Sequence, residues 1–392
     1  MPTAPWRHAA NGGIFMHENI CGLSAFQLYR VPPQVLEMFP LFPDIAYRSG
    51  KLQLLHYPLN HLHIDLPLQT LVTQRKHLRY RESVTTKLWT GELPPGAFCE
   101  NALGITLTSP LYTLLTMAPQ ISEIQLLMAM YEFCGSFAIF SPTPEIQQEV
   151  ERLPVSHDWE QVRDVEGRPT SLWRRRPLVE PEELVQFARA TSGIRGHKKL
   201  LRAAHYVRGA AASPLEAQTA ILFALSRRLG GEELPPFSIN HRITLSPQAR
   251  TIANQNTCFA DIFFEQTDKH PALDIECHGH MAHDGSVKGG LDANRALALQ
   301  SMGIEVVFLT HEQICDTARF YAVVQHIASI LGACRPPKTE LMRHREINVR
   351  RELFCDWELL GHRLPHAARQ RTRSPLAVAQ AASGLEKQAN KN

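Results

Sequence analysis

The chain has 392 residues, with 41 Lys and Arg against 38 Asp and Glu, and 44% of its residues are hydrophobic. This is the composition of an ordinary soluble globular protein, and the length allows two domains, each with its own core. Without a long apolar run or a basic-then-apolar N-terminus, we expect no membrane span and no secretory signal. The eight cysteines form no CxxC pair, which indicates reduced thiols and a cytoplasmic location.

The first part of the chain, residues 1–140, mixes short apolar runs with prolines and then becomes helical over 109–135. Ser109 suits the N-cap of that helix and Pro110 its first position. Residues 141–182 are polar and repeatedly interrupted by Pro and Gly, so we expect a polar linker there. The pattern therefore predicts a separate N-terminal α+β domain.

The next part, residues 183–335, alternates clear helix and strand patterns. Two short amphipathic helices come first, and Ser213, Pro214 and a closing Gly pair mark a stronger helix over 213–231. We then expect strands over 238–245, 259–265, 272–280 and 304–310, with helices over 291–303 and 317–332. The fold class is thus α/β with a mixed sheet, in the order α-β-β-β-α-β-α.

The C-terminal segment, residues 336–392, carries an excess of Lys and Arg over Asp and Glu. We expect a basic, disordered tail. Such a tail more often keeps a protein soluble than binds phosphate specifically, so we favour the first role.

Polar side chains alternate with apolar ones at the end of the third strand, placing Asp274, Glu276, His278 and His280 on one face. If the preceding turn is centred between 268 and 269, Asp261 lies directly opposite Glu276. Two adjacent carboxylates repel, and a divalent cation with a preference for oxygen, such as Mg²⁺ or Mn²⁺, would hold them together. A slip of one residue in the register would separate the pair.

Glu216 has two interpretations. It can be a third carboxylate aimed at the same metal ion, or it can complete a capping box with Ser213, which local sequence favours. Asp292 and Arg295 lie one turn apart and by default form an exposed ion pair. His280 and His283, with Asp284, can be loop residues without a role, but histidines beside a carboxylate pair favour a role in proton transfer, which we expect for His278 or His283.

Together these elements resemble the PD-(D/E)XK nuclease superfamily, in particular the domain of very-short-patch-repair (Vsr)-like endonucleases. The resemblance covers residues 213–332 and rests on "SPLEAQTAILFAL", "ADIFF", "LDIECHGHMAH" and "DANRALALQSMGIEVVFLT". It implies a restriction-endonuclease-like core. The positions that match the pattern of the family are Glu216, Asp261, Glu276, Gly279, His283, Asp292 and Arg295.

The resemblance implies a Mg²⁺-dependent endonuclease that hydrolyses DNA phosphodiesters. Asp261 and Glu276 would hold the metal ion with help from Glu216, and the catalytic set would include His278 and His283. Lys288 and Arg295 would contact phosphate. The family has Lys, or often Asp in this branch, where this chain has His278, and a histidine lacks the permanent charge of a lysine.

The N-terminal stretches "SAFQLYR", "LPPGAF" and "SPLYTLLTMAPQISEIQLLMAMYEFCG" resemble AbiEi-like regions, the regulator partners of abortive-infection toxin–antitoxin systems. This implies a regulatory or recognition region that binds DNA or a partner protein, in a setting of phage defence. The alternative to a nuclease is a DNA-binding, antitoxin-like regulator that keeps the nuclease fold and has lost its chemistry. The sequence leaves the oligomeric state open.

Overall fold

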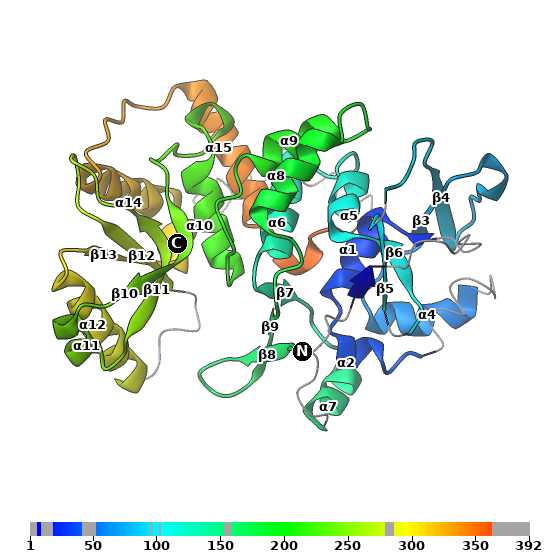
Figure 1. Cartoon of the computed structure of the whole chain (residues 1–392), viewed down its shortest axis with the longest axis horizontal. Helices are drawn as coiled ribbons and strands as arrows, with labels where there is room; N and C mark the ends of the chain where they lie inside the picture. Colours follow the sequence, from blue (N-terminus) through cyan, green and yellow to red (C-terminus); the bar gives the residue numbers. More distant parts are fainter. Residues whose placement is uncertain are drawn as a thin grey trace, which may run out of the picture.

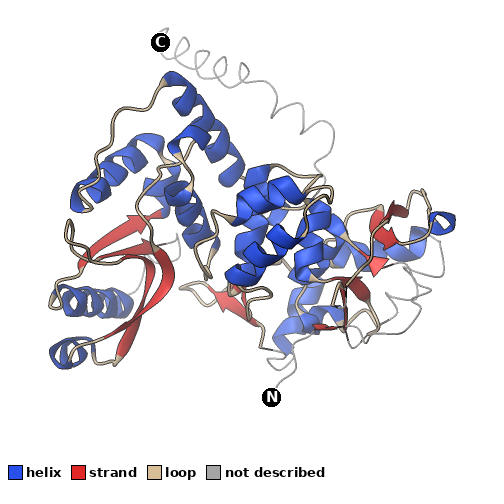
Figure 2. Ribbon diagram, turned by 45° about the horizontal axis from the view of Figure 1, so that its top comes forward, coloured by secondary structure: helices blue, strands red, loops and turns tan. Residues whose placement is uncertain are grey.

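The computed structural model describes residues 6–8, 19–40, 52–94, 96–101, 103–152, 158–278 and 286–362, which form a mixed α/β protein with three sheets. The molecule is elongated, with a four-stranded sheet at one end and a six-stranded sheet at the other (Figure 1). A helical layer and a small three-stranded sheet lie between them (Figure 2). The predicted fold class is confirmed.

The N-terminal sheet has the strand order β1-β5-β6-β2-β3-β4. Its strands are β1 Trp6–His8, β2 Asn19–Ile20, β3 Leu68–Val72, β4 Val84–Leu88, β5 Phe98–Asn101 and β6 Thr106–Thr108. The helices of this part are α1 Gly22–Arg30, α2 Pro33–Leu36, α4 Leu52–His61, η2 Arg75–His77, α5 Pro110–Met117 and α6 Glu123–Cys134.

The helix expected over 109–135 is two helices, α5 and α6. Pro119 follows the end of α5, and Ser122 opens α6 with a capping box that includes Gln125. The break has a local cause, since proline lacks the N–H that a continuous helix needs and the capping box satisfies the first N–H groups of the second helix.

The C-terminal sheet has the strand order β10-β11-β12-β13, and only β12 and β13 are parallel. Its strands are β10 Ser238–Thr244, β11 Thr257–Phe264, β12 Leu273–His278 and β13 Glu305–Thr310. The helices of this part are α10 Pro214–Ala224, η3 Arg227–Leu229, α11 Pro247–Ala253, α12 Ser286–Gln300, α13 His311–Cys315 and α14 Thr317–Ile330. The expected order α-β-β-β-α-β-α is confirmed, with α11 and α13 as additional short helices.

Two apolar layers cover the two faces of this sheet. Leu273 and Ile275 belong to a large cluster that includes α10 and continues into the N-terminal part. Phe263 and Val306 belong to a smaller cluster with Ala298 of α12. Because side chains alternate along a strand, Asp274 between Leu273 and Ile275 faces the smaller cluster.

The segment 141–182 is not an unstructured linker. It contains α7 Pro144–Arg152, β8 Glu160–Arg163 and β9 Pro169–Arg174, and β9 pairs with both β8 and β7 Phe137–Ile139. Trp173 of β9 is buried, and its indole N–H donates to the carbonyl of Phe140. The apolar side chains of this segment thus complete the core between the two ends, and helices α8 Pro181–Ala190 and α9 His197–Ala204 follow as expected.

The expectation of a disordered tail is wrong for residues 336–362, whereas 363–392 lie outside the described residues. Helix α15 Glu340–Leu353 and the turn η5 Trp357–Leu359 return to the N-terminal part. Arg30 of α1 donates to Glu132 at 2.9 Å and to the carbonyl of Trp357 at 2.9 Å. The indole of Trp357 donates to the same carboxylate at 2.7 Å, so buried polar bonds fix this segment in place.

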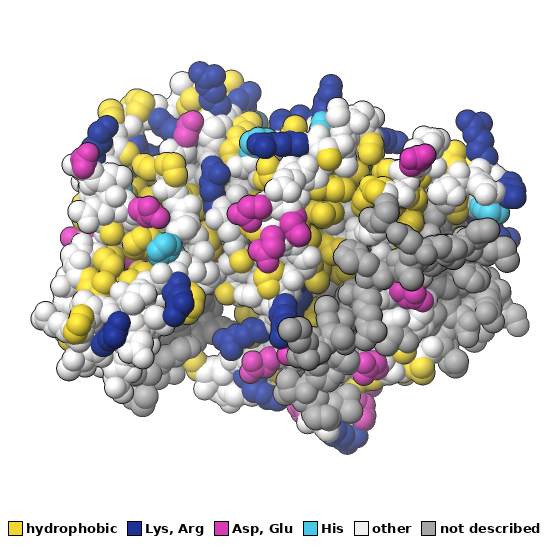
Figure 3. Space-filling model, in the orientation of Figure 1, with side chains coloured by type: hydrophobic (Ala, Val, Ile, Leu, Met, Phe, Trp, Pro, Cys, Tyr) yellow, Lys and Arg dark blue, Asp and Glu magenta, His cyan; other side chains and the backbone are white. Residues whose placement is uncertain are grey.

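No helix in the described ranges has the length and apolar character needed to cross a membrane. On the face drawn in Figure 3, Lys and Arg side chains are spread over the molecule, and a few of them lie at the end where β3 and β4 are.

Candidate active site

The hairpin of β11 and β12 has the predicted register, with Ile262 opposite Ile275 and Phe264 opposite Leu273. One step further, the carboxylate of Asp261 accepts the backbone N–H of Cys277 at 2.7 Å. The Asp261 carboxylate therefore lies against the backbone of β12, where the charge of Glu276 acts on it. The register continued by one step would set Asp261 opposite Glu276, as the sequence predicts.

Asp261 is in an environment that disfavours its charge. Burial, followed by the nearby carboxylates of Glu216 and Glu276, raises the pKa of Asp261 from 3.8 to about 8. The Cys277 N–H and the charge of Arg295 act in the opposite direction, but more weakly. At neutral pH this carboxyl group therefore holds its proton unless a cation binds beside it.

Glu216 caps its own helix, as local sequence favours. Its backbone N–H donates to Ser213 Oγ, and its carboxylate accepts the Ala212 N–H at 2.7 Å and the Ser213 hydroxyl at 2.9 Å. The amide of Asn240 in β10 donates to the same carboxylate at 3.2 Å. Burial raises the pKa of Glu216, and the charge of Glu276 adds to the shift. Glu216 is thus both a cap and a member of the carboxylate cluster.

Asp274 is the residue that sequence reasoning left without a role. It is 0% exposed, and neither of its carboxylate oxygens has a hydrogen-bond partner among the described residues. Burial, followed by the charge of Glu276, raises the pKa of Asp274 to about 10. The alternating polar pattern of β12 already placed it on the same face as Glu276, which was the signal available in the sequence.

Glu276 is bound by an arginine. Arg295 of α12 donates to its carboxylate at 2.5 Å and also to the carbonyl of Phe259. Arg295, expected in an exposed pair with Asp292 or on phosphate, thus ion-pairs with Glu276. The guanidinium supplies positive charge inside the cluster, and one of its two terminal nitrogens donates both to Glu276 and to the carbonyl of Phe259.

His278 lies at the end of β12, with its ring 4.9 Å from that of Phe308. It lines a hollow of about 10 Å³ together with Glu276 and Arg295, which is room for about one water molecule. His283 lies outside the described residues. Lys288 is in α12, but the position of its side chain is not described.

The cluster fits Mg²⁺ in the chemistry of its donors. Glu216, Asp261, Asp274 and Glu276 are hard oxygen donors, and a divalent cation bound among them would displace the protons that the raised pKa values of Asp261 and Asp274 retain at neutral pH. Among the described residues, however, no three Asp, Glu, His or Cys side chains converge closely enough to hold a metal ion together. Arg295 has to release Glu276 before Asp261 and Glu276 could share one ion.

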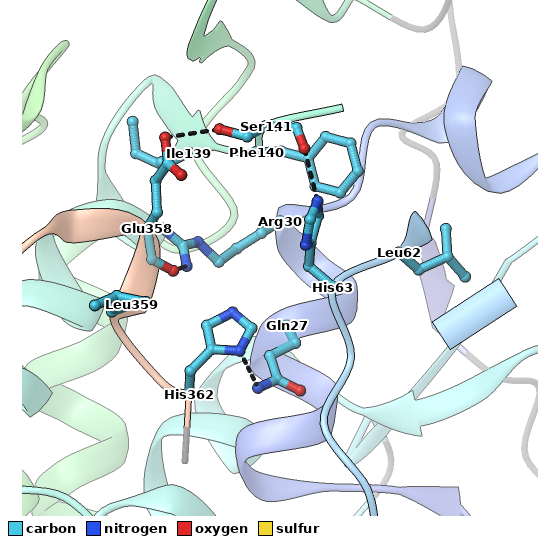
Figure 4. Close-up of a pocket in the computed structure, with 10 residues that line it drawn as sticks. All are labelled: Gln27, Arg30, Leu62, His63, Ile139, Phe140, Ser141, Glu358, Leu359 and His362. Atoms are coloured by element: carbon cyan, nitrogen blue, oxygen red, sulfur yellow. Dashed lines mark hydrogen bonds between the residues drawn. The ribbon is translucent and has the colours of Figure 1, made fainter. Parts of the chain in front are cut away.

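A second hollow, of about 200 Å³, lies where the C-terminal segment meets α1 (Figure 4). Its polar side chains bond to one another: Ser141 donates to Glu358 at 2.6 Å, and His63 contacts the carbonyl of Ser141 at 2.7 Å. Arg30 donates to the carbonyls of Glu358 and Leu360. These bonds hold the C-terminal segment in place against α1.

Comparisons of the chain with protein-family models and with curated proteins, and of its structure with solved structures, find no match.

Proposed function

We propose that this protein is a Mg²⁺-dependent, endonuclease-like hydrolase that acts on DNA phosphodiesters. The observation that carries the proposal is the carboxylate cluster at the β11–β12 hairpin, in which Asp274 is buried, Asp261 is half-buried and both carboxyl groups have raised pKa values. Such a cluster is stable only if it takes up protons or a cation. The order and strand directions of α10, β10–β13 and α12 agree with the core that the resemblance to PD-(D/E)XK nucleases implies.

In this proposal, Asp261 and Glu276 would hold the metal ion, and Glu216, at the start of α10, would help directly or through a water molecule. The metal ion would supply charge stabilisation and an activated water. His278 stands two residues beyond Glu276, beside a hollow of the size of one water, and would hold that water or accept its proton. Arg295 would contact phosphate once Glu276 is released to the metal ion, Lys288 would be a second phosphate contact, and His283 would be a further proton carrier.

The ion pair between Arg295 and Glu276 supports a second candidate function. In a DNA-binding regulator that has lost the chemistry, a guanidinium can take over the charge of the metal ion and keep the fold stable. The presence of His278 where the family has Lys also fits a regulator that has lost the nuclease chemistry. If the protein is such a regulator, its N-terminal part would bind a toxin–antitoxin partner protein.

Plasmid nicking separates the two functions. The full chain is incubated with supercoiled DNA in Mg²⁺, Mn²⁺ or chelator, together with Asp261→Asn, Glu276→Gln and the control Asp268→Asn in the exposed turn of the same hairpin. A nuclease nicks only with metal, and only the control variant keeps the activity. No nicking on any DNA form, with DNA binding unchanged in chelator, would contradict the proposal and support the regulator.

A further inference from the structure

The connection between β3 and β4 is strongly basic. Residues 73–83 read TQRKHLRYRES, with four Lys or Arg and a single acid, Glu82. Arg75, Lys76 and Arg81 are exposed, and in the described part of the chain none of them forms an ion pair. A solvated loop of this charge attracts polyanions, and phosphates most of all, because guanidinium groups match their geometry.

A groove of about 680 Å³ lies beside this loop. Tyr80 of the loop lines it and is 74% exposed, so most of its ring is open to solvent. Trp89, just beyond β4, lines it as well, and its indole N–H has no hydrogen-bond partner among the described residues. Arg195, in the turn between α8 and α9, is exposed on the groove, so two aromatic rings and cationic groups share one depression.

The floor of the groove is preformed. Lys87 of β4 donates to Gln69 at 2.7 Å and to the carbonyl of Thr116, and the ring of Trp89 lies edge-on to that of Tyr112 at 5.7 Å. These contacts hold Lys87 and Trp89 in position, so these two side chains lose less conformational entropy when a ligand binds. The groove also contains one acid, Glu92.

We infer that this loop and groove bind an unpaired stretch of DNA, with phosphates on Arg75, Lys76 and Arg81 and a base stacked on Tyr80. A cationic track combined with an exposed aromatic ring is the arrangement by which proteins hold single strands without reading their sequence. Reading a duplex in its major groove takes a helix or a β-ribbon, whereas this loop offers a single 3-10 turn, η2.

The groove and the carboxylate cluster lie at opposite ends of the molecule (Figure 1). This inference rests on the proposed function in taking DNA as the ligand, and it adds a contact remote from the site of cleavage. The test of this inference measures DNA binding in chelator, where no metal-dependent cleavage can occur. The inference can therefore fail while plasmid nicking succeeds, and it can hold while nicking fails.

The test is fluorescence anisotropy of labelled oligonucleotides with the full chain in chelator, over a range of salt concentrations. The probes are a single strand of mixed sequence, its duplex, and a Glu-rich peptide. The loop variant combines Arg75→Ala, Lys76→Ala and Arg81→Ala. The charge-matched control combines Arg189→Ala, Lys269→Ala and Arg351→Ala, which are exposed positions elsewhere on the chain.

We expect the loop variant to bind the single strand at least about tenfold more weakly than the wild type. The slope of log affinity against log salt concentration should be smaller in magnitude by about two. The control variant should differ less than about threefold from the wild type, because it only lowers the overall charge. Tyr80→Ala should weaken single-strand binding by about fivefold or more, whereas Tyr80→Phe keeps the stacking ring and should retain affinity.

Equal losses in the loop and control variants would overturn the inference, since general charge would then explain binding. Preference for the duplex, or for the Glu-rich peptide, would also overturn it. Circular dichroism of each variant shows whether the fold is kept, and Tyr80→Ala, on an exposed side chain, tests the groove independently of the charge changes.

Discussion

The buried carboxyl of Asp274 gives a quantitative test of the cluster. Asp274→Asn keeps the shape of the side chain but has no charge to lose. We expect the variant to be more stable than the wild type at alkaline pH and nearly equal to it near pH 4, because only the wild type has to keep a proton on this residue in order to fold.

The magnitude follows from the two pKa values. In the unfolded chain an aspartate ionises near ~3.9, whereas burial and the charge of Glu276 raise the pKa of Asp274 in the folded protein to about 10. Between these values the folded protein binds one proton more than the unfolded chain. The free energy of unfolding therefore falls with rising pH, by ~1.4 kcal/mol per pH unit. At pH 7 the loss is on the order of 4 kcal/mol.

The assay is urea unfolding followed by tryptophan fluorescence, in chelator, at pH values from 5 to 8. The pKa of Asp261, raised to about 8, lowers the stability of both proteins in the same direction, so the difference between them isolates Asp274. Asp268→Asn, in the exposed turn of the same hairpin, is the control for the substitution itself. A stability difference between Asp274→Asn and wild type that stays constant over this pH range would refute the reasoning.

Three further predictions concern stability at neutral pH and can be measured by the same unfolding assay. Glu216→Ala removes the bonds to Ala212 and Ser213 and should cost about 1–2 kcal/mol; no loss would show that the cap is dispensable. Arg30→Met leaves the buried carboxylate of Glu132 without its ion-pair partner and should cost about 3–5 kcal/mol, and a loss below about 1 kcal/mol would contradict this. Leu273→Ala, at a fully buried position of β12, should cost about 2–5 kcal/mol, and a neutral effect would mean that the core beneath the carboxylates is not packed as described.

The sequence by itself determined the local features of the C-terminal part. Apolar alternation located β10–β13, a polar turn set the register that places Asp261 next to Glu276, and Ser213 and Pro214 marked the start of α10. These features depend on residues one to four positions apart or directly across one hairpin. Their geometry follows from the side-chain repeat of a helix or strand and from the turn of the hairpin.

Only the tertiary structure decided the charge state of the site. Burial of Asp274 without a partner depends on the layer that α12 and β13 place over it, and the pairing of Arg295 with Glu276 depends on how α12 crosses the sheet. The packing of residues 336–362 also came from tertiary contacts, because Arg30 and Glu132 lie far from them in sequence. Desolvation and long-range pairing arise from which surfaces meet, and a linear pattern does not contain that information.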